Sequence, residues 1–267
     1  MSNAAIYMCI LRQKQGRRCL KQILIPLACL FFRFAGAQDL EAQLAAAAKL
    51  EAAGKETEAL QQYREILQQD STHPEALSHA SILCSLEGSR QTGKAETPYF
   101  RAAQQYAAAA LRQNPDQTTA NLAMAMALDR LASVSGVKEK VTYLRDEKKY
   151  ADLALKIDPQ NAQAWYILGA WNIRIGNMNF AEKAAAKMLF GGLPKGSLQE
   201  AIQDFEQCRK LDPAFIRNYY ALASAYHAAE DDLKAISTLQ QGLRLRSIRQ
   251  DDNRIKQDCR KLLEQLQ

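Results

Sequence analysis

The sequence contains few of the residues and none of the common motifs that mark catalytic or metal-binding proteins. Histidine occurs 3 times in 267 residues, and no two cysteines have Cys-x-x-Cys spacing. Walker, Gly-x-Gly-x-x-Gly, His-Glu-x-x-His and Gly-x-Ser-x-Gly motifs are also absent. Because catalysis and metal binding need several convergent groups, we expect no enzyme activity, no metal and no cofactor.

The histidines and the later cysteines are too dispersed to form a site. His73 precedes a proline in a turn, and His79 lies five residues before Cys84, which is poor spacing for shared metal ligation on a helix. We therefore interpret the histidines as structural. The cysteines that follow residue 37 are an odd, widely spaced set, which argues against a disulfide framework and predicts buried thiols: Cys84, Cys208 and Cys259.

Aromatic residues and unbalanced charge are both scarce beyond the first 37 residues. Aromatics make up 7% of the chain and apolar residues 48%, with alanine prominent among them. Small side chains let helices approach closely, which favours packed helical hairpins over a sheet sandwich. Six basic residues and no acidic ones lie in 1–37, so the remainder holds 29 basic and 29 acidic residues. This balance predicts no nucleic-acid partner.

Residues 1–37 have the layout of a secretory signal peptide. Basic residues precede the apolar run 23–32, and Ala35-Gly36-Ala37 places small residues where cleavage before Gln38 requires them. The apolar run is about half of the ~20 residues that a membrane-spanning helix needs. We therefore expect export to the periplasm or the extracellular space.

Two alternatives for this leader remain open. It is an uncleaved anchor if the apolar run stays in the membrane, or a lipoprotein signal if Cys29 receives a lipid. The apolar Leu30-Phe31-Phe32 after that cysteine is unlike the start of a mature lipoprotein.

A turn signal recurs along the rest of the chain. Asp or Asn stands at 70, 114, 158 and 212, at spacings of 44, 44 and 54 residues, and a proline follows directly in the last three cases. Each signal separates two alanine-rich amphipathic stretches. A near-constant period of this length predicts a solenoid of helical hairpins that bury one continuous core.

The pattern predicts an all-α, tetratricopeptide-repeat-like domain over 38–267. It has about five antiparallel hairpins, a helical insert at 177–196 and a capping helix at 251–266. The helices are expected at 40–53, 57–69, 75–86, 98–111, 118–133, 138–157, 164–176, 180–189, 198–211, 218–229, 231–245 and 251–266.

Individual residues match the tetratricopeptide pattern. Ala59 and Tyr63 have the offsets of a second helix, where a small residue lets the two helices meet. Trp165, Leu168 and Gly169 have the offsets of a first helix. We interpret Gly191-Gly192-Leu193-Pro194 as the turn that ends the insert helix, because glycine supplies the backbone freedom needed there.

Repeat phase also predicts a binding groove on the first helices. Asn121, Trp165 and Tyr219 are taken as equivalent positions, which makes Arg130 and Arg174 equivalent in adjacent repeats. Paired guanidinium groups suit a carboxylate or phosphate, with tyrosines as flat apolar walls. The candidate groove residues are Asp129, Arg130, Tyr166, Arg174, Arg217, Tyr220 and His227.

Three stretches between about Leu111 and Leu245 resemble the regulator of microtubule dynamics family. They are 135–140 (SGVKEK), 168–171 (LGAW) and, most specifically, 185–194 (AAKMLFGGLP) followed by 197–201 (SLQEA). The resemblance implies a tetratricopeptide array. Animal members of the family are linked to microtubules, mitochondria and membrane contact sites, and lipid binding has been proposed for them. The export leader departs from those members and would keep this chain away from microtubules.

The sequence as a whole predicts a non-enzymatic scaffold that holds a protein or peptide in its groove. The alternative is a lipid-binding or lipid-transfer module of the cell envelope. That alternative is suggested by the family resemblance and by the apolar Met188-Leu189-Phe190 of the insert, a trio that also suits packing against the core.

Overall fold

The computed structural model describes residues 39–267, so the predicted signal peptide lies outside the described residues. The chain divides into two compact units, residues 1–46 and residues 47–267. Within the first unit, residues 39–46 are helical. The second unit carries every feature discussed below. Among the residues that the structure describes, no helix is both long and apolar enough to cross a bilayer.

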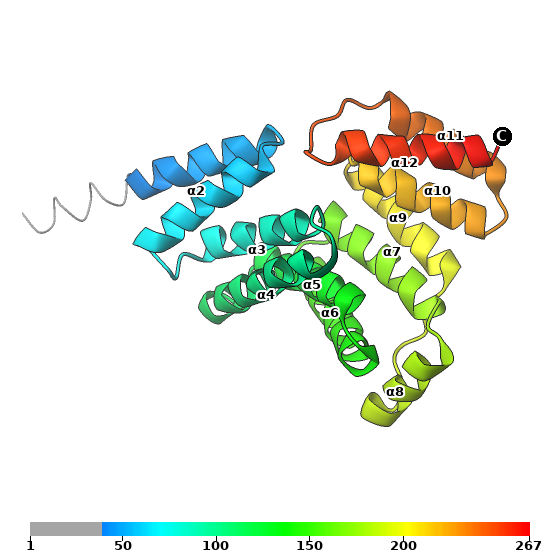
Figure 1. Ribbon diagram of the computed structural model, residues 1–267, viewed down its shortest axis with the longest axis horizontal. Coiled ribbons are helices and arrows are strands. Elements are labelled where there is room, and N and C mark those ends of the chain that lie inside the picture. Colours follow the sequence, from blue (N-terminus) through cyan, green and yellow to red (C-terminus); the bar gives the residue numbers. More distant parts are fainter. Residues whose placement is uncertain (1–38) are drawn as a thin grey trace, which may run out of the picture. The chain divides into compact units, whose positions relative to one another are not determined.

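Helices and connecting turns make up the whole of residues 47–267, without a β-strand (Figure 1). This confirms the predicted all-α class, and most helix ends fall within about two residues of those expected. The unit opens with a helical segment at 47–52. The elements that follow are α2 (Glu56–Gln69), α3 (Pro74–Gly88), the short 3-10 helix η1 (Gly93–Ala95), α4 (Glu96–Gln113), α5 (Thr118–Val134), α6 (Val137–Ile157), α7 (Ala162–Gly176), α8 (Phe180–Phe190), α9 (Leu198–Leu211), α10 (Ile216–Ala228), α11 (Asp232–Arg244) and α12 (Asp252–Gln265).

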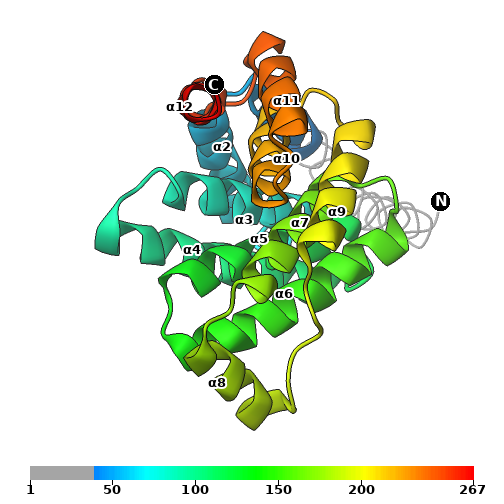
Figure 2. The same ribbon diagram turned by 90° about the vertical axis from the view of Figure 1, so that its right-hand side faces the viewer.

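The helices pair into hairpins that stack in chain order. The pairs α3–α4, α5–α6, α7–α9 and α10–α11 each pack closely, and α2 packs on α3. The first helices of successive hairpins also contact one another, α3 with α5, α5 with α7 and α7 with α10. Helix α12 covers α10 and α11 at the end of the stack, as Figure 2 shows. This is the arrangement of a tetratricopeptide solenoid with a capping helix.

The recurring turn signal has the same local structure at each of its four positions. At each one, the side-chain Oδ1 of the Asp or Asn accepts a hydrogen bond from the backbone N–H two residues later, at 3.0–3.2 Å. The same residues cap the C-termini of α2, α4, α6 and α9. An Asx turn both ends one helix and sets the direction of the next. The four residues are Asp70, Asn114, Asp158 and Asp212.

The register inferred for the first helices is also confirmed. Asn121 Nδ2, Trp165 Nε1 and Tyr219 Oη each donate a hydrogen bond to the carbonyl of the proline six residues earlier, at 2.8–2.9 Å. Three different side chains therefore perform one structural role at equivalent positions. This role fixes which face each first helix turns toward its neighbours.

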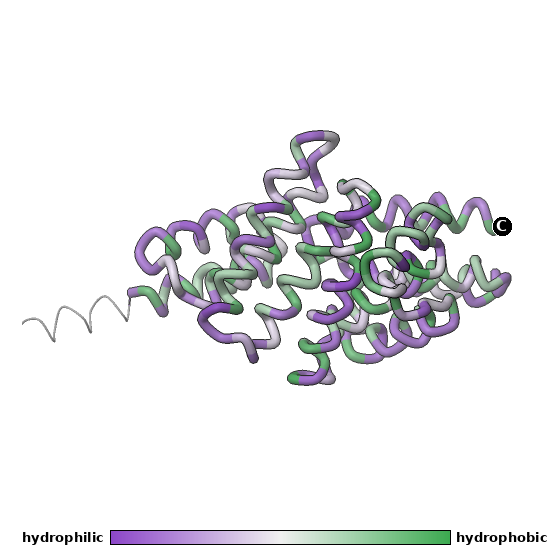
Figure 3. Tube along the Cα trace, turned by 90° about the horizontal axis from the view of Figure 1, so that it is seen from below, coloured by the Kyte–Doolittle hydropathy of each residue, from purple (hydrophilic) through white to green (hydrophobic). Residues whose placement is uncertain are grey.

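Small residues allow the hairpins to pack closely. A Cβ atom placed on Gly169 of α7 would lie 2.6 Å from the Phe205 ring on α9, so only glycine permits this approach. Ala59 and Tyr63, the residues expected to close the first hairpin, are both fully buried. Each helix has an apolar face and a polar face, so hydrophobic and hydrophilic colours alternate along the helices in Figure 3.

The insert forms α8 between the two helices of its hairpin and packs on α6. Asn179 and Glu182 form a full capping box at its start, which the sequence-based prediction did not include. Ser197, the predicted cap of the next helix, does accept a hydrogen bond from the Glu200 amide at 3.1 Å. At the end of α8, Gly191 adopts a left-handed φ of 73°, as the glycine-rich turn predicted.

Candidate binding pocket between the first helices

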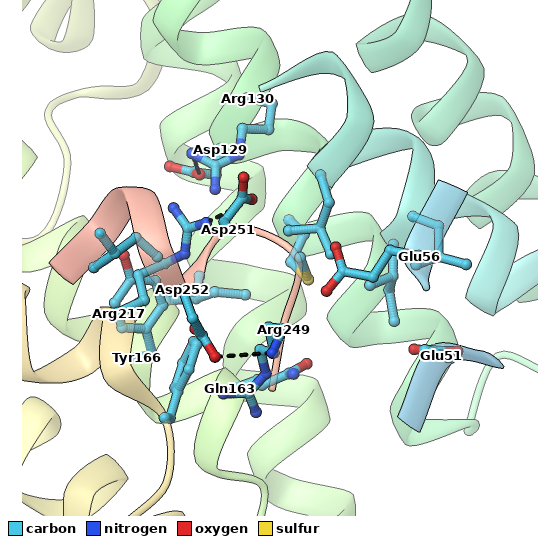
Figure 4. A pocket seen from close by; sticks show the side chains of 17 residues that line it. Glu51, Glu56, Asp129, Arg130, Gln163, Tyr166, Arg217, Arg249, Asp251 and Asp252 are labelled. Atoms are coloured by element: carbon cyan, nitrogen blue, oxygen red, sulfur yellow. Dashed lines mark hydrogen bonds and ion pairs between the residues drawn. The ribbon is translucent and has the colours of Figure 1, made fainter. Parts of the chain in front are cut away.

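A pocket of about 110 Å³ lies between the first helices of four successive hairpins (Figure 4). Its apolar lining includes Leu86 from α3, Met126 from α5 and Ile167 from α7. Phe215, immediately before α10, adds an aromatic ring. The Asx turns and the shared side-chain bonds described above bring these faces together, because they hold each first helix in the same orientation.

Four of the seven predicted groove residues line this pocket: Asp129, Arg130, Tyr166 and Arg217. The other three do not. Arg174 lies about two helical turns beyond Ile167 on α7, paired with Asp129. Tyr220 is partly exposed on α10, and His227 forms a 2.6 Å hydrogen bond to Asp232 near the end of that helix. The assignment of these seven residues to ligand binding stays a prediction.

The two arginines predicted to form a pair do converge, but on carboxylates of this chain. Arg174 pairs with both Asp129 and Glu147, and Arg130 Nη1 lies 3.2 Å from Asp129 Oδ2. Glu147 comes from α6, the second helix of its hairpin, which groove-phase reasoning did not consider. We call Asp129, Arg130, Glu147 and Arg174 the inner cluster. Its positive and negative charges balance formally.

Burial dominates the electrostatics of the inner cluster. Glu147 is fully buried, and this burial raises its pKa to about 8, with the Asp129 carboxylate adding to the effect and Arg174 and Arg130 opposing it. Glu147 Oε2 and the Nε atoms of both arginines are buried without a hydrogen-bond partner. The cluster therefore retains unused hydrogen-bonding capacity next to the pocket.

Tyr166, which repeat phase predicted as one aromatic wall of the groove, lies in the lining of the pocket. Its ring packs against Phe205 at 5.7 Å and edge-on against Phe215 at 5.2 Å between centroids. The Arg249 guanidinium lies 4.3 Å from the centre of the Phe215 ring. Tyr220 was expected to provide a second wall, but it is not among the residues that line the pocket.

The remaining side of the pocket comes from the link between α11 and α12, residues 245–251, which we call the strap, and from the start of α12. Asp251 Oδ2 accepts a hydrogen bond from Arg217 at 3.2 Å, and its Oδ1 lies 3.3 Å from Arg90 Nε. Arg90 also pairs with Glu56 and, at 3.0 Å, with Glu87. Sequence reasoning missed the strap, because it lies between two periodic segments and has no repeat phase of its own.

The described residues offer little for metal or thiol chemistry. No group of three or more His, Cys, Asp or Glu side chains within 39–267 is placed to hold a metal ion. The cysteines at 84, 208 and 259 are buried free thiols. Burial raises the pKa of Cys208 to about 12 and that of Cys259 to about 11, so neither is a reactive thiolate at neutral pH.

Comparison with solved structures supports the fold. A thermophilic tetratricopeptide-repeat protein from Thermus thermophilus superposes with a TM-score of 0.58, covering 85% of this chain and 98% of that one, at 16% sequence identity. At this identity the likeness concerns the fold alone.

Comparison with curated proteins points to one group of relatives. Human regulator of microtubule dynamics protein 2 is 25% identical over 158 residues, covering 59% of this chain and 38% of that protein. Mouse regulator of microtubule dynamics protein 3 is 27% identical over 109 residues, covering 41% of this chain and 23% of that protein. The chain thus spans less than two fifths of the length of either relative.

A family model extends the match well beyond these local alignments. The model that describes regulator of microtubule dynamics proteins 1-3 matches residues 43–267, which include every hairpin, the insert and the capping helix. The chain belongs to the regulator of microtubule dynamics family.

Proposed function

We propose that this protein is a non-enzymatic scaffold that binds a segment of a partner polypeptide between its first helices. The observation that carries this proposal is the pocket itself, which is shared by four successive hairpins. A ligand there would contact α3, α5, α7 and the start of α10 in turn. Tetratricopeptide solenoids provide extended surfaces of this kind, and few have catalytic groups.

The lining of the pocket suits a peptide. Apolar side chains such as Leu86 and Met126 line it together with the charged side chains of Asp129, Arg130 and Arg217. Apolar area provides affinity, and a few fixed polar groups set the register of the bound segment. The volume of about 110 Å³ is small for a peptide, so a bound segment requires the walls to separate.

Site-specific photo-crosslinking in the producing cells tests this proposal. A photoreactive residue at Gln163, which lines the pocket, should capture a defined partner that mass spectrometry identifies. The matched control carries the same group at Lys149, which is exposed on α6. The purified partner should then bind the full chain, and Met126→Glu should weaken binding at least tenfold while Lys149→Glu leaves it unchanged. Equal capture from both positions would contradict the assignment.

A lipid-binding role is the second candidate, and the surface of α8 is the observation that favours it. Phe180 is 88% exposed and Met188 is 69% exposed, and they lie in one row along the helix with Ala184 between them. Lys183 and Lys187 form the adjacent exposed row. An apolar row beside a basic row is typical of a helix that lies on an anionic membrane surface.

Vesicle flotation separates the two candidates. If α8 binds membranes, the full chain should float with vesicles that contain a quarter phosphatidylglycerol, and Phe180→Ser with Met188→Ser should abolish flotation. Leu233→Ser is the matched control, because Leu233 is equally exposed but lies on α11. Absence of flotation, together with organic extracts free of lipid, would rule out this second candidate.

Export through a cleaved leader also stays a proposal. It rests on the layout of residues 1–37 and on the small residues before Gln38. N-terminal sequencing of the protein recovered from its own cells should begin at Gln38. A sequence that begins at Met1 or Met8 would favour the membrane anchor instead, and a lipid attached to Cys29 would favour the lipoprotein.

A further inference from the structure

The strap joins the two ends of the 47–267 unit. Gln250 accepts a hydrogen bond from the Thr57 amide at 3.3 Å and donates one to Thr57 Oγ1 at 3.2 Å, across 193 residues of sequence. Arg90 and Asp251 form the ion pair described above, across 161 residues. Figure 1 shows the link before α12 directed toward the turn that precedes α2. The strap therefore contacts the first hairpin as well as the last.

The strap is an ordered loop with its own supports. The backbone amides of Ile248 and Arg249 both donate to the Asp252 carboxylate at 2.8 Å, and Asp252 is buried. Arg249 donates to Asp212 at 2.9 Å. Two adjacent amides that share one carboxylate hold the backbone in a tight bend. The side chain of Asp251, immediately before Asp252, points into the pocket, as Figure 4 shows.

One glycine accommodates the close passage of the strap. Gly54 has a φ of 73°, and a Cβ atom at this position would lie 1.8 Å from the carbonyl oxygen of Ile248. Any other residue would collide with the strap backbone as well as strain the turn. The absence of a side chain at Gly54 thus leaves room on the first hairpin for the strap backbone to pass.

The charges around Asp251 are those of a carboxylate-binding site. Asp251 is nearly buried, and it lies between two guanidinium groups from different hairpins, Arg90 and Arg217. Within residues 39–267, Arg217 forms its ion pair with Asp251. Without the Asp251 carboxylate, Arg217 would remain beside the pocket as a cation that is four-fifths buried.

We propose that the strap is a built-in ligand, and that the pocket accepts an extended, acidic segment of a partner whose carboxylate replaces Asp251 between Arg90 and Arg217. This inference rests on the proposed scaffold function and narrows it to an acidic peptide. It also accounts for the small volume of the pocket, because the strap occupies one side of it. Partner binding then requires the strap to leave.

The strap competes as a tethered ligand. A tethered segment acts at a high effective concentration, so it excludes a free peptide of similar affinity. The apparent dissociation constant of the partner rises by the inverse of the fraction of molecules with an open strap. If one molecule in ten is open, for example, a change that frees the strap tightens binding about tenfold.

A peptide-binding assay on the full chain tests this proposal. The probe is a fluorescent copy of residues 250–253 (Gln-Asp-Asp-Asn), which carries two acidic residues and no basic one, and the control probe carries Asp251→Asn. The variant Asp251→Asn in the protein should bind the acidic probe about tenfold more tightly than the unmodified protein does. Adding Arg217→Gln to that variant should remove the gain. Asp258→Asn, which removes one exposed charge elsewhere on α12, is the matched control and should leave binding unchanged.

Hydrogen exchange of the Ile248 and Arg249 amides shows whether the probe displaces the strap. Binding of the acidic probe should accelerate exchange at both amides at least tenfold. Binding with unchanged protection would overturn the proposal, because the probe would then occupy another site. If Asp251→Asn fails to fold, Gly54→Ala provides a second way to expel the strap, since its Cβ meets the Ile248 carbonyl.

The remaining outcomes separate this proposal from the scaffold function. Equal affinities for the unmodified protein, Asp251→Asn and Asp258→Asn would overturn the idea of a built-in ligand. Failure of every variant to bind the acidic probe would overturn the acidic ligand class. In both cases the scaffold function would still stand or fall on the crosslinking from Gln163, which assumes nothing about the charge of the partner.

Discussion

The inner cluster and the group formed by Arg90, Arg217 and Asp251, which we call the strap cluster, have the same chemistry but different structural origins. In the inner cluster, Arg174 pairs with carboxylates on α5 and α6, so repeat packing alone brings the charges together. In the strap cluster, Arg90 and Arg217 share a carboxylate on a loop that follows the last hairpin. The first set lies within the stack, whereas the second includes a side chain from the strap.

This difference indicates which arginines are available to a ligand. A partner that reached Arg174 would have to displace Glu147, which is fixed inside the core of its hairpin. A partner that reached Arg217 would have to displace only Asp251 and the strap. Ion pairs of similar appearance therefore have different functional value, according to whether the acidic partner lies on a helix or on a loop.

The largest expected effect comes from Glu147→Ala, which disrupts the inner cluster. It removes a fully buried side chain and one partner of Arg174. We expect the free energy of unfolding to fall by about 3 kcal/mol, measured by chemical denaturation. Asp152→Ala, which removes an exposed carboxylate of the same helix, should change it by less than about 0.5 kcal/mol. Similar losses in both variants would contradict the role of the cluster.

The pH dependence of stability sharpens the same comparison. Burial raises the pKa of Glu147 to about 8 in the folded state, well above its usual value. A raised folded pKa means that the stabilising contribution is complete at low pH and is lost as pH rises toward 8. We expect stability to fall by about 2 kcal/mol between pH 6 and pH 8. Glu147→Gln, which cannot ionise, should abolish this fall. If stability of Glu147→Gln fell with pH in parallel with that of the unmodified protein, the raised pKa of Glu147 would not be its cause.

Arg90→Ala tests the strap cluster. It leaves the nearly buried Glu56 without its guanidinium partner and frees one side of Asp251. We expect a loss of about 2 kcal/mol, together with faster hydrogen exchange at Ile248 and Arg249. Arg101→Ala, an exposed position on α4, serves as the control. Unchanged exchange in the strap would show that Arg90 does not hold it.

The smallest effect on stability is expected for Asp251→Asn. The amide keeps the shape of the side chain and one acceptor oxygen but loses the charge that faces Arg90 and Arg217. We expect a loss of about 1 kcal/mol in thermal or chemical unfolding. A loss larger than that caused by Glu147→Ala would reverse the comparison, because the strap would then contribute more stability than the inner cluster.

Local patterns in the sequence were sufficient to predict most of the fold. The Asp or Asn at 70, 114, 158 and 212 marks each turn because its side chain replaces a backbone acceptor, and this chemistry is visible in the residue itself. Helical periodicity then located the helices. The equivalence of Asn121, Trp165 and Tyr219 was inferred from phase, and their common hydrogen bond to a proline carbonyl confirms it.

The candidate site was harder to predict, since repeat phase says which way a residue points but not what opposes it. Repeat phase predicted that Arg130 and Tyr166 face the groove, and both line the pocket, although their role in binding stays a prediction. The burial of Glu147 beside Arg174 depends on how α6 packs across α7, which no local pattern encodes. The approach of Asp251 to Arg90 depends on the path of a loop after 161 residues of intervening chain. Such contacts become visible only in the structure.

The passage of the strap over Gly54 has a consequence for how this solenoid unfolds. An open array behaves as a one-dimensional chain of neighbours, in which the terminal repeats fray independently. Here the last connection rests on the first hairpin, so loosening either terminus removes contacts from the other. The two ends should lose structure together, and a Gly54→Ala change near the start should be detected as fraying of α12 near the end.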